Sequence, residues 1–419
     1  MVDLIDVPRG YNVTWLRAPR SVAVLGAGVI GLAVARELTR RYPDMAVTVV
    51  EKERRVAAHQ SGHNSGVVHA GVYYPPGSLK ASLCRRGAGL LREFCEEHAL
   101  PFRVLGKLIV ATSDAEVKGL GRLEERARRN GVPGIRMMKS EEITEIEPEA
   151  RGAAALYSPS TAAVDFAAVC RALADDIVRH GGEIALGREV TAVTEHSDGV
   201  EVTDSVRRQT FDRVIVCAGL HGDAFAGMSG RLSDIRIIPF RGEYYALRPE
   251  ASRRVRGMIY PVPDPRYPFL GIHLTRDVYD EVHVGPNAVL ALALEGYRRR
   301  DVDLSDLVRL ASWPGTWRLA AAHWRHGTSE LASSLFKHRY LAAVRRYLPD
   351  LEPADLVRAT AGVRAQAVDR SGQLVDDFVL QDAGRVFLVR NAPSPAATSS
   401  LAIAEHIVSA LSGMPTSAR

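Results

Sequence analysis

The stretch that most constrains the fold is residues 21–52, in which two apolar runs flank the sequence GAGVIG at 26–31. The first apolar run predicts a buried strand, and apolar residues at helical spacing follow the glycines. Gly26 permits a tight turn, Gly28 lets the backbone approach a pyrophosphate, and Gly31 allows helix and strand to pack closely. The pattern therefore predicts a strand–turn–helix unit that binds a dinucleotide at the helix N-terminus.

A second apolar run ends on Glu51, twenty residues after Gly31. A carboxylate at this distance from the glycine turn can accept hydrogen bonds from the ribose 2′-hydroxyl of a dinucleotide. The same charge repels a 2′-phosphate, so the sequence favours FAD or NAD over NADP. We include the next residue, Lys52, among those that contact the dinucleotide.

The composition is typical of a soluble globular protein, since 46% of the 419 residues are hydrophobic and 25% are charged. A chain of this length is expected to form two domains. No apolar run reaches the ~20 residues that cross a bilayer. Residues 1–20 carry Asp3 and Asp6 and lack the apolar core of a secretory signal, so we interpret them as an N-terminal extension.

The charge distribution and the cysteines indicate which partners and which cellular compartment the sequence favours. The net charge is +5, but basic and acidic residues are interspersed along the chain, which argues against nucleic-acid binding. The four cysteines show no CxxC spacing, which favours a reducing, cytoplasmic compartment. Arginines at 339–346 lie among leucine and valine residues; we favour a helix with one solvated face, and a peripheral membrane contact is the alternative.

Downstream of the glycine turn, several segments have a clear pattern. Residues 53–79 form a loop rich in Gly, Ser, His and Asn, of the kind that holds a ligand. The apolar strand at 211–219 is expected to return beside the first strand. Residues 236–287 are rich in strands, residues 304–348 are predominantly helical, and residues 401–411 form a closing helix.

These segments predict an α/β protein in which a Rossmann-like FAD- or NAD-binding domain is interleaved with an α+β second domain on a mostly antiparallel sheet. We assign residues 21–90, 150–225 and 355–419 to the dinucleotide-binding domain. Residues 91–149 and 226–354 then form the second domain, which we expect to bind the substrate.

Further segments carry a family resemblance: HQSGHNSGVVHAGVYYPPGSLKASLC (59–84), PFRGEYYAL (239–247), PFLGIHLT (268–275), VGPNAVLA (284–291), GVRAQAVDRSGQLVDDFVL (362–380) and NAPSPAATSSLAIAEHI (391–407). Together they resemble the L-2-hydroxyglutarate oxidase/dehydrogenase family. This family is a branch of the FAD-dependent oxidoreductases that includes glycine oxidase and D-amino-acid oxidase. The resemblance weakens at 275–283 and 305–335, so it constrains the substrate less than the cofactor.

The resemblance implies noncovalent FAD as the cofactor. The glycine turn would hold the pyrophosphate near residues 218–219, Glu51 the adenosine ribose, and the backbone of Val190 the adenine. Segment 61–66 would run along the flavin ring, and the turn at 396–399 would direct N–H groups at the flavin N1/O2 edge, where a helix N-terminus stabilises negative charge. The implied cofactor-binding residues are Gly26, Gly28, Gly31, Glu51, Lys52, Ser61, His63, Asn64, Ser65, Gly66, Val190, Ala218, Gly219, Ala396, Ala397, Thr398 and Ser399.

Three histidines, His59, His63 and His69, lie in the first of these segments. We interpret them as packing noncovalently around the flavin ring. One alternative is covalent flavin attachment through a histidine, as in some relatives of the superfamily. Another is a metal site, against which the absence of a carboxylate cluster beside them in the sequence argues. We therefore assign no metal.

Oxidation of a 2-hydroxy acid requires that its carboxylate is held, its C2–H is directed at flavin N5 and its hydroxyl proton is accepted. Arg364 is our candidate for the carboxylate, because a guanidinium pairs bidentately with it. His273 is our candidate base, because an imidazole pKa near ~6.5 suits proton acceptance around neutral pH. His63 and His69 are the alternative bases. Tyr73, Asn64 and Asn287 are expected to contact the substrate or the flavin.

The predicted reaction is hydride transfer from C2 to flavin N5, which gives a 2-oxo acid, followed by electron transfer to oxygen or a quinone. A second carboxylate, as in 2-hydroxyglutarate, needs a second cation, for which Arg241 and Lys80 are candidates. The alternative substrates are an amino acid, an amine, or a hydroxy or amino compound of a biosynthetic pathway. The residue pattern is also compatible with a flavoprotein without turnover or with an NAD-dependent dehydrogenase, and the sequence leaves the oligomeric state open.

Overall fold

The computed structural model describes residues 19–228, 234–264 and 270–412, so nearly all of the predicted N-terminal extension lies outside the described residues. The helices are α1 Val29–Arg41, α2 Leu79–Glu97, α3 Asp114–Arg129, α4 Ser140–Ile146, α5 Phe166–Arg179, α6 Gly222–Met228, α7 Pro249–Ser252, α8 Leu304–Ala311, α9 Pro314–Leu335, α10 Lys337–Arg345 and α11 Ala396–Ser412. Short 3-10 turns are η1 Gln60–Gly62, η2 Gly219–His221 and η3 Pro353–Asp355.

The strands fall into four sheets. Their bounds are β1 Ser21–Leu25, β2 Ala46–Val50, β3 Val67–Val68, β4 Phe102–Val104, β5 Lys107–Ala111, β6 Arg136–Lys139, β7 Ala154–Ser158, β8 Ala162–Val164, β9 Glu183–Ala185, β10 Val190–Glu195, β11 Val200–Asp204, β12 Arg208–Phe211, β13 Arg213–Val216, β14 Ile235–Leu247, β15 Met258–Pro261, β16 His273–Arg276, β17 Val282–Gly285, β18 Val289–Leu290, β19 Leu356–Asp369, β20 Val379–Ala383 and β21 Val386–Asn391.

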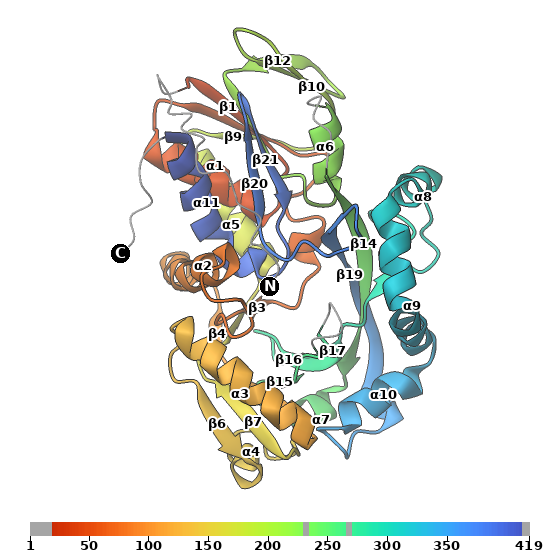
Figure 1. Cartoon of the computed structure of the whole chain (residues 1–419). Coiled ribbons are helices and arrows are strands. Elements are labelled where there is room, and N and C mark those ends of the chain that lie inside the picture. The colour runs from red at the N-terminus through yellow and green to blue at the C-terminus, as the bar shows by residue number, and fades with distance from the viewer. Residues whose placement is uncertain (1–18, 229–233, 265–269, 413–419) are drawn as a thin grey trace.

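The first large sheet has the order β20-β21-β13-β1-β2-β9, and all its strands are parallel except the edge strand β20. The helices α1, α5 and α11 pack on one face, and the β10–β12 meander packs on the other (Figure 1). Because β1 is covered on both faces, its sequence is a continuous apolar run instead of an alternating one. The predicted return of the strand after residue 211 is confirmed, since β13 pairs with β1.

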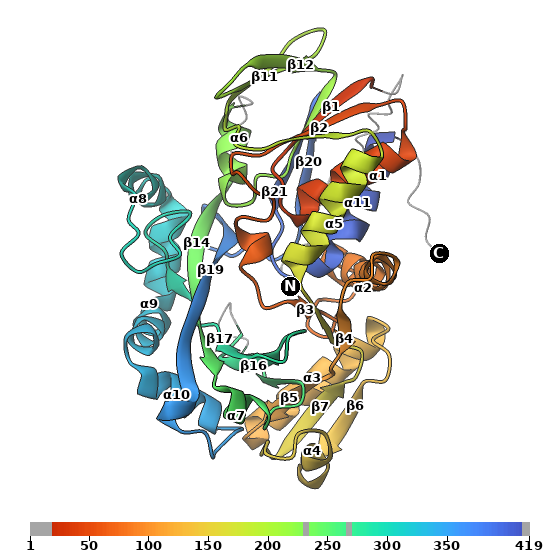
Figure 2. The same ribbon diagram turned by 180° about the vertical axis from the view of Figure 1, so that it is seen from behind.

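The second large sheet has nine strands, in the order β18-β14-β17-β16-β15-β5-β7-β6 with β19 paired to β14. Its pairings are antiparallel apart from β15 with β5, as expected for the second domain. The long strands β14 and β19 pair along almost their whole length. Both views show α8, α9 and α10 on the outer side of these two strands (Figure 2).

The predicted fold class, a Rossmann-like domain interleaved with an antiparallel-sheet domain, is confirmed by these two sheets. Two strands belong to a different sheet from the domain to which the sequence assigned them. β7 lies within 150–225 and β19 within 355–419, yet both are part of the nine-stranded sheet. The domain boundaries remain a proposal, and we favour counting these two strands with the second domain.

The closing helix starts earlier than predicted. It begins at Ala396 and not at Leu401, so the expected turn at 396–399 is its first helical turn. Pro395 precedes it, and its carbonyl accepts a hydrogen bond from the Ser399 N–H. The small residues Ala396 and Ala397 do not give the apolar spacing that marks the later part of the helix, which explains the difference.

The arginine-rich segment at 339–346 is a helix with one solvated face, as predicted. Leu341, Val344 and Leu348 are buried against β14 and its neighbours, while Arg339 is exposed. Among the described residues, no helix is both long enough and apolar enough to cross a bilayer.

The contact between α2 and α11 gives a test of the packing. A Cβ on Gly87 would lie 2.4 Å from the Thr398 carbonyl oxygen, whereas a Cβ on Gly89, in the same helix, would meet nothing within 4 Å. We expect Gly87→Ala to lower the free energy of unfolding by about 1–3 kcal/mol through overpacking. Gly89→Ala should raise it by up to ~1 kcal/mol through helix propensity. Thermal melting followed by circular dichroism checks this, and shifts of the same sign would contradict it.

Candidate active site

A cavity of about 1190 Å³ lies between the two large sheets. It exceeds the ~300–1,000 Å³ that is usual for pockets that hold a drug-sized ligand. Its walls come from the β1–α1 turn, the loop after β2, the end of β13, strand β19 and the start of α11. The cavity thus lies at the carboxyl ends of the parallel strands, where open α/β sheets bind ligands.

The glycine turn is shaped by close backbone contacts. Gly26 has φ +107°, and a Cβ there would lie 2.6 Å from the Cys217 carbonyl oxygen. A Cβ on Gly31 would lie 2.0 Å from the Gly26 carbonyl oxygen, so Gly31 packs the helix and does not line the cavity. Gly28 does line it, and the Val29 N–H at the start of α1 donates to Ser61 Oγ at 2.9 Å.

Glu51 lies at the end of β2 and holds the backbone of two turns. Its Oε2 accepts from the Ala27 N–H at 2.7 Å, and its Oε1 accepts from the Glu53 N–H at 2.9 Å. Each carboxylate oxygen retains capacity for another hydrogen bond. Glu51 and Val190 both line the cavity, so the carboxylate is available to a ribose hydroxyl there.

The neighbourhood of His59 differs from the expectation that no carboxylates accompany the histidines. Glu53 and Glu295 both lie near its Nε2, at 3.0 and 3.4 Å. These three groups are close enough to hold a metal ion. However, the Lys52 ammonium contacts Glu53 and lies 2.7 Å from Glu295, so a protein cation already balances the two carboxylates.

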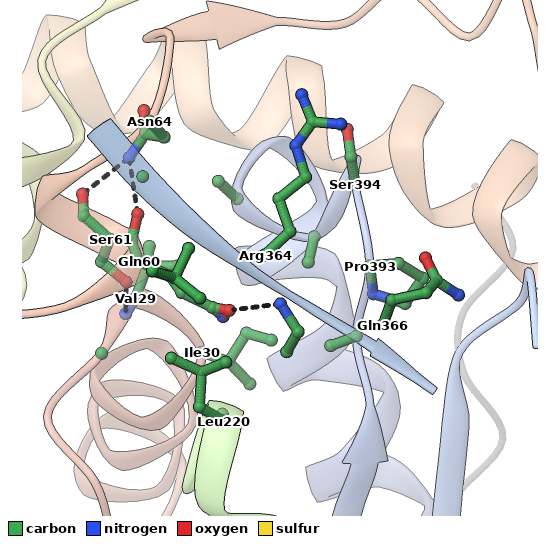
Figure 3. Close-up of a pocket in the computed structure, with 18 of the residues that line it drawn as sticks. Val29, Ile30, Gln60, Ser61, Asn64, Leu220, Arg364, Gln366, Pro393 and Ser394 are labelled. Carbon is green, nitrogen blue, oxygen red and sulfur yellow. Dashed lines mark hydrogen bonds between the residues drawn. The ribbon is translucent and has the colours of Figure 1, made fainter. Parts of the chain in front are cut away.

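The segment formed by η1 and the loop after it is held by hydrogen bonds and lies against β19. Asn64 Nδ2 donates to the Ser61 carbonyl at 2.8 Å, and its Oδ1 accepts from the Gly66 N–H at 2.9 Å (Figure 3). The Ala365 N–H donates to Gln60 Oε1 at 3.4 Å. Since this loop carries Ser61, His63, Asn64 and Ser65 on the cavity wall, the contact brings both domains to one site.

Arg364 extends from β19 into the cavity (Figure 3). It makes a side-chain hydrogen bond with Tyr244, which is on the paired strand β14. Burial raises the pKa of the Tyr244 hydroxyl, and Arg364 partly offsets this. The predicted carboxylate-binding arginine is therefore in the cavity, but it comes from the second sheet and not from the dinucleotide-binding sheet.

His273 is a buried residue of β16 in the cavity wall. Its ring stacks on Tyr260 at 3.9 Å between centroids, and its Nδ1 lies 2.8 Å from the Gly271 carbonyl oxygen. A proton on Nδ1 that donates to this carbonyl leaves Nε2 as an acceptor. Burial, with a smaller effect of Arg364 and Lys107, lowers the pKa of His273 to about 3, so the ordinary imidazole value assumed from the sequence is wrong here.

His69 and Tyr73 lie in the same region. The His69 N–H donates to Thr398 Oγ1 at 3.1 Å, which links the loop to the start of α11. Burial lowers the pKa of His69 to about 3. Within the described structure, His69 Nδ1 and the Tyr73 hydroxyl are buried without a hydrogen-bond partner. Unpartnered polar groups in a cavity wall are expected to meet a polar ligand.

The remaining predicted residues divide into two groups. Ala218, Gly219, Ala396 and Ala397 line the cavity. The structure does not place Asn287, Gly66, Ser399 or Arg241 in the cavity wall. Asn287 Oδ1 instead accepts from the Glu243 N–H at 2.8 Å, and Arg241 pairs with the Glu243 carboxylate. Arg241 and the Oδ1 atom of Asn287 are therefore engaged within the sheet, whereas Asn287 Nδ2 is buried without a hydrogen-bond partner among the described residues.

Tyr244, Tyr260 and Lys107 were not predicted from the sequence as site residues. The two tyrosines line the cavity, and Lys107 Nζ lies 5.0 Å from the Tyr260 ring centroid. The tyrosines resemble ordinary core aromatics in a strand. The sequence could have drawn attention to Lys107, because it begins the apolar run KLIVA in a chain with only six lysines among 54 basic residues.

These features fit FAD. The glycine turn leaves room for a pyrophosphate at the start of α1, Glu51 offers acceptors for a ribose, and unpartnered polar groups lie farther along the cavity. The fold and site thus define an FAD-dependent oxidoreductase.

Comparison with known proteins leads to the same class. The family model "FAD dependent oxidoreductase" (DAO) matches residues 21–410. The chain is 45% identical over 422 residues to the mitochondrial L-2-hydroxyglutarate dehydrogenase of Nematostella vectensis, covering 95% of this chain and 92% of the relative. It is 43% identical to the L-2-hydroxyglutarate dehydrogenase of Escherichia coli K12, covering 92% of each. The chain therefore belongs to the FAD-dependent oxidoreductase family, in the branch of the L-2-hydroxyglutarate dehydrogenases, and FAD is its cofactor.

Solved structures support the fold. The FAD-bound L-α-glycerophosphate oxidase of Mycoplasma pneumoniae superimposes with a TM-score of 0.76 at 23% identity, covering 94% of both chains. Glycine oxidase of Geobacillus kaustophilus gives a TM-score of 0.72 at 17% identity, covering 95% of both chains. At these identities the likeness shows the shared fold alone.

The assignment of Glu51 to the adenosine ribose gives a binding prediction. Glu51→Ala should weaken FAD binding about 10- to 100-fold, because hydrogen bonds to a charged group contribute ~1.5–3 kcal/mol each. Titration of the deflavinated protein with FAD, followed by flavin fluorescence, measures this. The control is Glu96→Ala, which removes an exposed carboxylate paired with Arg92 on α2 and should leave the affinity unchanged. Equal affinities in both variants would remove Glu51 from the site.

Proposed function

We propose that this protein oxidises L-2-hydroxyglutarate to the corresponding 2-oxo acid. The similarity to L-2-hydroxyglutarate dehydrogenases extends over more than nine-tenths of the chain. The structural observation that carries the proposal is that Arg364 and His273 line one cavity together with the glycine turn. An anion-binding cation and a proton acceptor are the groups that oxidation of a 2-hydroxy acid requires.

Arg364 would bind the C1 carboxylate, with the Tyr244 hydroxyl holding the guanidinium in place. The C2 hydroxyl would then face Nε2 of His273, which accepts the hydroxyl proton as the C2–O bond becomes a carbonyl. FAD, when bound, supplies the acceptor for the hydride that leaves C2. Because Arg364 contributes to the low pKa of His273, a carboxylate that neutralises Arg364 makes the imidazole more basic once substrate is bound.

The amino-acid or amine oxidase alternative is tested by the same experiment as the main proposal. The purified FAD protein is titrated anaerobically with a panel of 2-hydroxy and 2-amino acids while the flavin absorbance is followed. We expect L-2-hydroxyglutarate to bleach the flavin. Bleaching by amino compounds alone would overturn the hydroxy-acid proposal, and no bleaching by any small acid would favour a flavoprotein without turnover.

For Arg364→Met we expect kcat/KM for L-2-hydroxyglutarate to fall by about 10²- to 10⁴-fold, mostly through KM, because a carboxylate would lose a bidentate charged partner. The FAD content should stay at the wild-type level. Steady-state kinetics with a dye acceptor and the flavin spectrum check the two parts. Arg358→Met, on the same strand but outside the cavity wall, is the matched control. Wild-type kinetics in Arg364→Met would exclude the residue from substrate binding.

We further propose that the reduced flavin passes its electrons to oxygen or a quinone. We also propose that the protein contacts an anionic membrane surface through α9. Trp324, Leu331 and Leu335 form an apolar stripe along the part of this helix that follows the kink at His323, and Trp317 precedes the kink; each of the four is more than half exposed. Arg318 and Arg325 flank the stripe. Exposed Trp and Leu beside Arg is the pattern of a helix that lies in a membrane interface. Four free cysteines fit a cytoplasmic location for such a peripheral protein.

The double variant Trp317→Ser/Trp324→Ser should lose most co-sedimentation with vesicles of phosphatidylcholine and phosphatidylglycerol, with its turnover of soluble substrate retained. Val206→Ser, which removes an exposed apolar residue of the distant β11–β12 turn, is the control. Absence of vesicle binding by the wild-type protein would contradict the proposal. Self-association through the stripe, seen by analytical ultracentrifugation, would assign the surface to a second copy of the chain.

A further inference from the structure

Lys107 is a buried cation that the reaction described above does not use. It is the first residue of β5, its exposure is 1%, and it lies in the nine-stranded sheet between β15 and β7. Among the described residues, no carboxylate is within ion-pair distance of its ammonium group. A buried ammonium without a counter-ion is costly, so such a lysine needs either a partner or a function.

Lys107 is not itself part of the cavity wall, but the two aromatic rings around its ammonium group are. The ammonium nitrogen lies 4.5 Å from the ring centroid of Tyr73 and 5.0 Å from that of Tyr260, and both rings line the cavity. Tyr260 in turn stacks on His273. The buried Tyr73 hydroxyl and His69 Nδ1, which have no hydrogen-bond partner in the described structure, belong to the same neighbourhood. Two aromatic faces stabilise the cation but do not neutralise it.

The other candidates for a second cation are already engaged. Arg241 is paired with the Glu243 carboxylate. Lys80 lines the cavity, but its ammonium is 2.7 Å from Asp376. Arg364 is assigned to the C1 carboxylate. Lys107 is therefore the buried cation of this region whose charge no carboxylate of the described chain balances.

Lys107 and Arg364 also act on the same residues. Both contribute to the electrostatic environment of His273, and Arg364 contributes to that of Tyr260, over which Lys107 lies. Both cations are therefore close enough to the Tyr260–His273 pair to act on it. A dianion whose hydroxyl meets His273 can direct one carboxylate toward each cation.

We propose that Lys107, together with the Tyr73 hydroxyl, binds the distal carboxylate of a dicarboxylic 2-hydroxy acid and so makes the enzyme selective for dicarboxylates. This inference rests on the proposed function, because it assigns the second anionic group of that substrate. Burial lowers the pKa of Lys107 to about 7 in the free protein. A bound carboxylate favours the charged form, so substrate and ammonium stabilise each other.

The test compares two five-carbon substrates, L-2-hydroxyglutarate and L-2-hydroxypentanoate, in which a methyl group replaces the distal carboxylate. Lys107→Met keeps an unbranched side chain, shorter by the terminal nitrogen, and removes its charge. We expect kcat/KM for the dicarboxylate to fall at least about 30-fold, since a lost buried charge pair costs several kcal/mol. The value for the monocarboxylate should change less than about threefold. Lys118→Met, on the exposed face of α3, is the control and should change neither.

Equal losses for the two substrates in Lys107→Met would overturn the proposal and make Lys107 a positioning residue for His273. Binding is measured separately, by the perturbation of the flavin spectrum by glutarate and by pentanoate, neither of which carries a hydroxyl to oxidise. Wild-type protein should bind glutarate more tightly than pentanoate, and Lys107→Met should bind the two alike. Unchanged discrimination in Lys107→Met would contradict the proposal.

A crystal structure of the wild-type holoenzyme with glutarate keeps the proposal testable if the variant does not fold. We expect one carboxylate within 3.5 Å of Lys107 Nζ and the other at Arg364. A distal carboxylate bound elsewhere, for example at Lys80, would overturn the assignment. If the wild-type protein fails to oxidise L-2-hydroxyglutarate but glutarate still binds at Lys107, the proposed reaction fails while the dicarboxylate site stands.

Discussion

The site depends on one close approach between segments that are distant in the sequence. Strand β19 runs against the loop after η1, where the Ala365 N–H donates to Gln60 and a Cβ on Gly362 would lie 2.4 Å from the His63 carbonyl oxygen. Only a glycine permits this backbone contact. It joins the loop that follows the dinucleotide cradle to the strand that carries Arg364, so both parts of the cavity are held in one geometry.

The distribution of charge along the cavity follows from the same arrangement. At the cradle end, Glu51 holds turns through backbone N–H groups, and the carboxylates of Glu53 and Glu295 are balanced by Lys52. At the other end, Arg364 and Lys107 lie near two histidines that burial keeps neutral. Because the protein supplies carboxylates at one end and cations at the other, the cavity is suited to a ribose at the first and to an acidic substrate at the second.

The outer helices have a separate role. α8, α9 and α10 cover the outer side of β14 and β19, and their inner residues, such as Tyr340 and Leu341, are buried there. The outward stripe of α9 remains exposed although it is apolar. One helical layer thus covers the sheet with its inner side and exposes apolar side chains on its outer side. The leucine and valine residues among the arginines at 339–346, for which the sequence predicted a helix with one solvated face, belong to α10 and its C-terminal end and are buried in this layer.

The sequence determined the local units. The spacing of Gly26, Gly28, Gly31 and Glu51 specified the cradle, since these positions interact within one strand–turn–helix unit. Segment motifs likewise predicted Arg364 and His273, which line one cavity in the structure. Tertiary structure alone decided that β19 joins the second sheet, that burial lowers the pKa of His273, and that Asn287 and Arg241 face partners in the sheet. It also showed that no carboxylate of the described chain balances Lys107, whereas the sequence signalled only a rare lysine at the start of an apolar strand. Burial, pairing and pKa depend on residues far away in the sequence, and no local pattern encodes them.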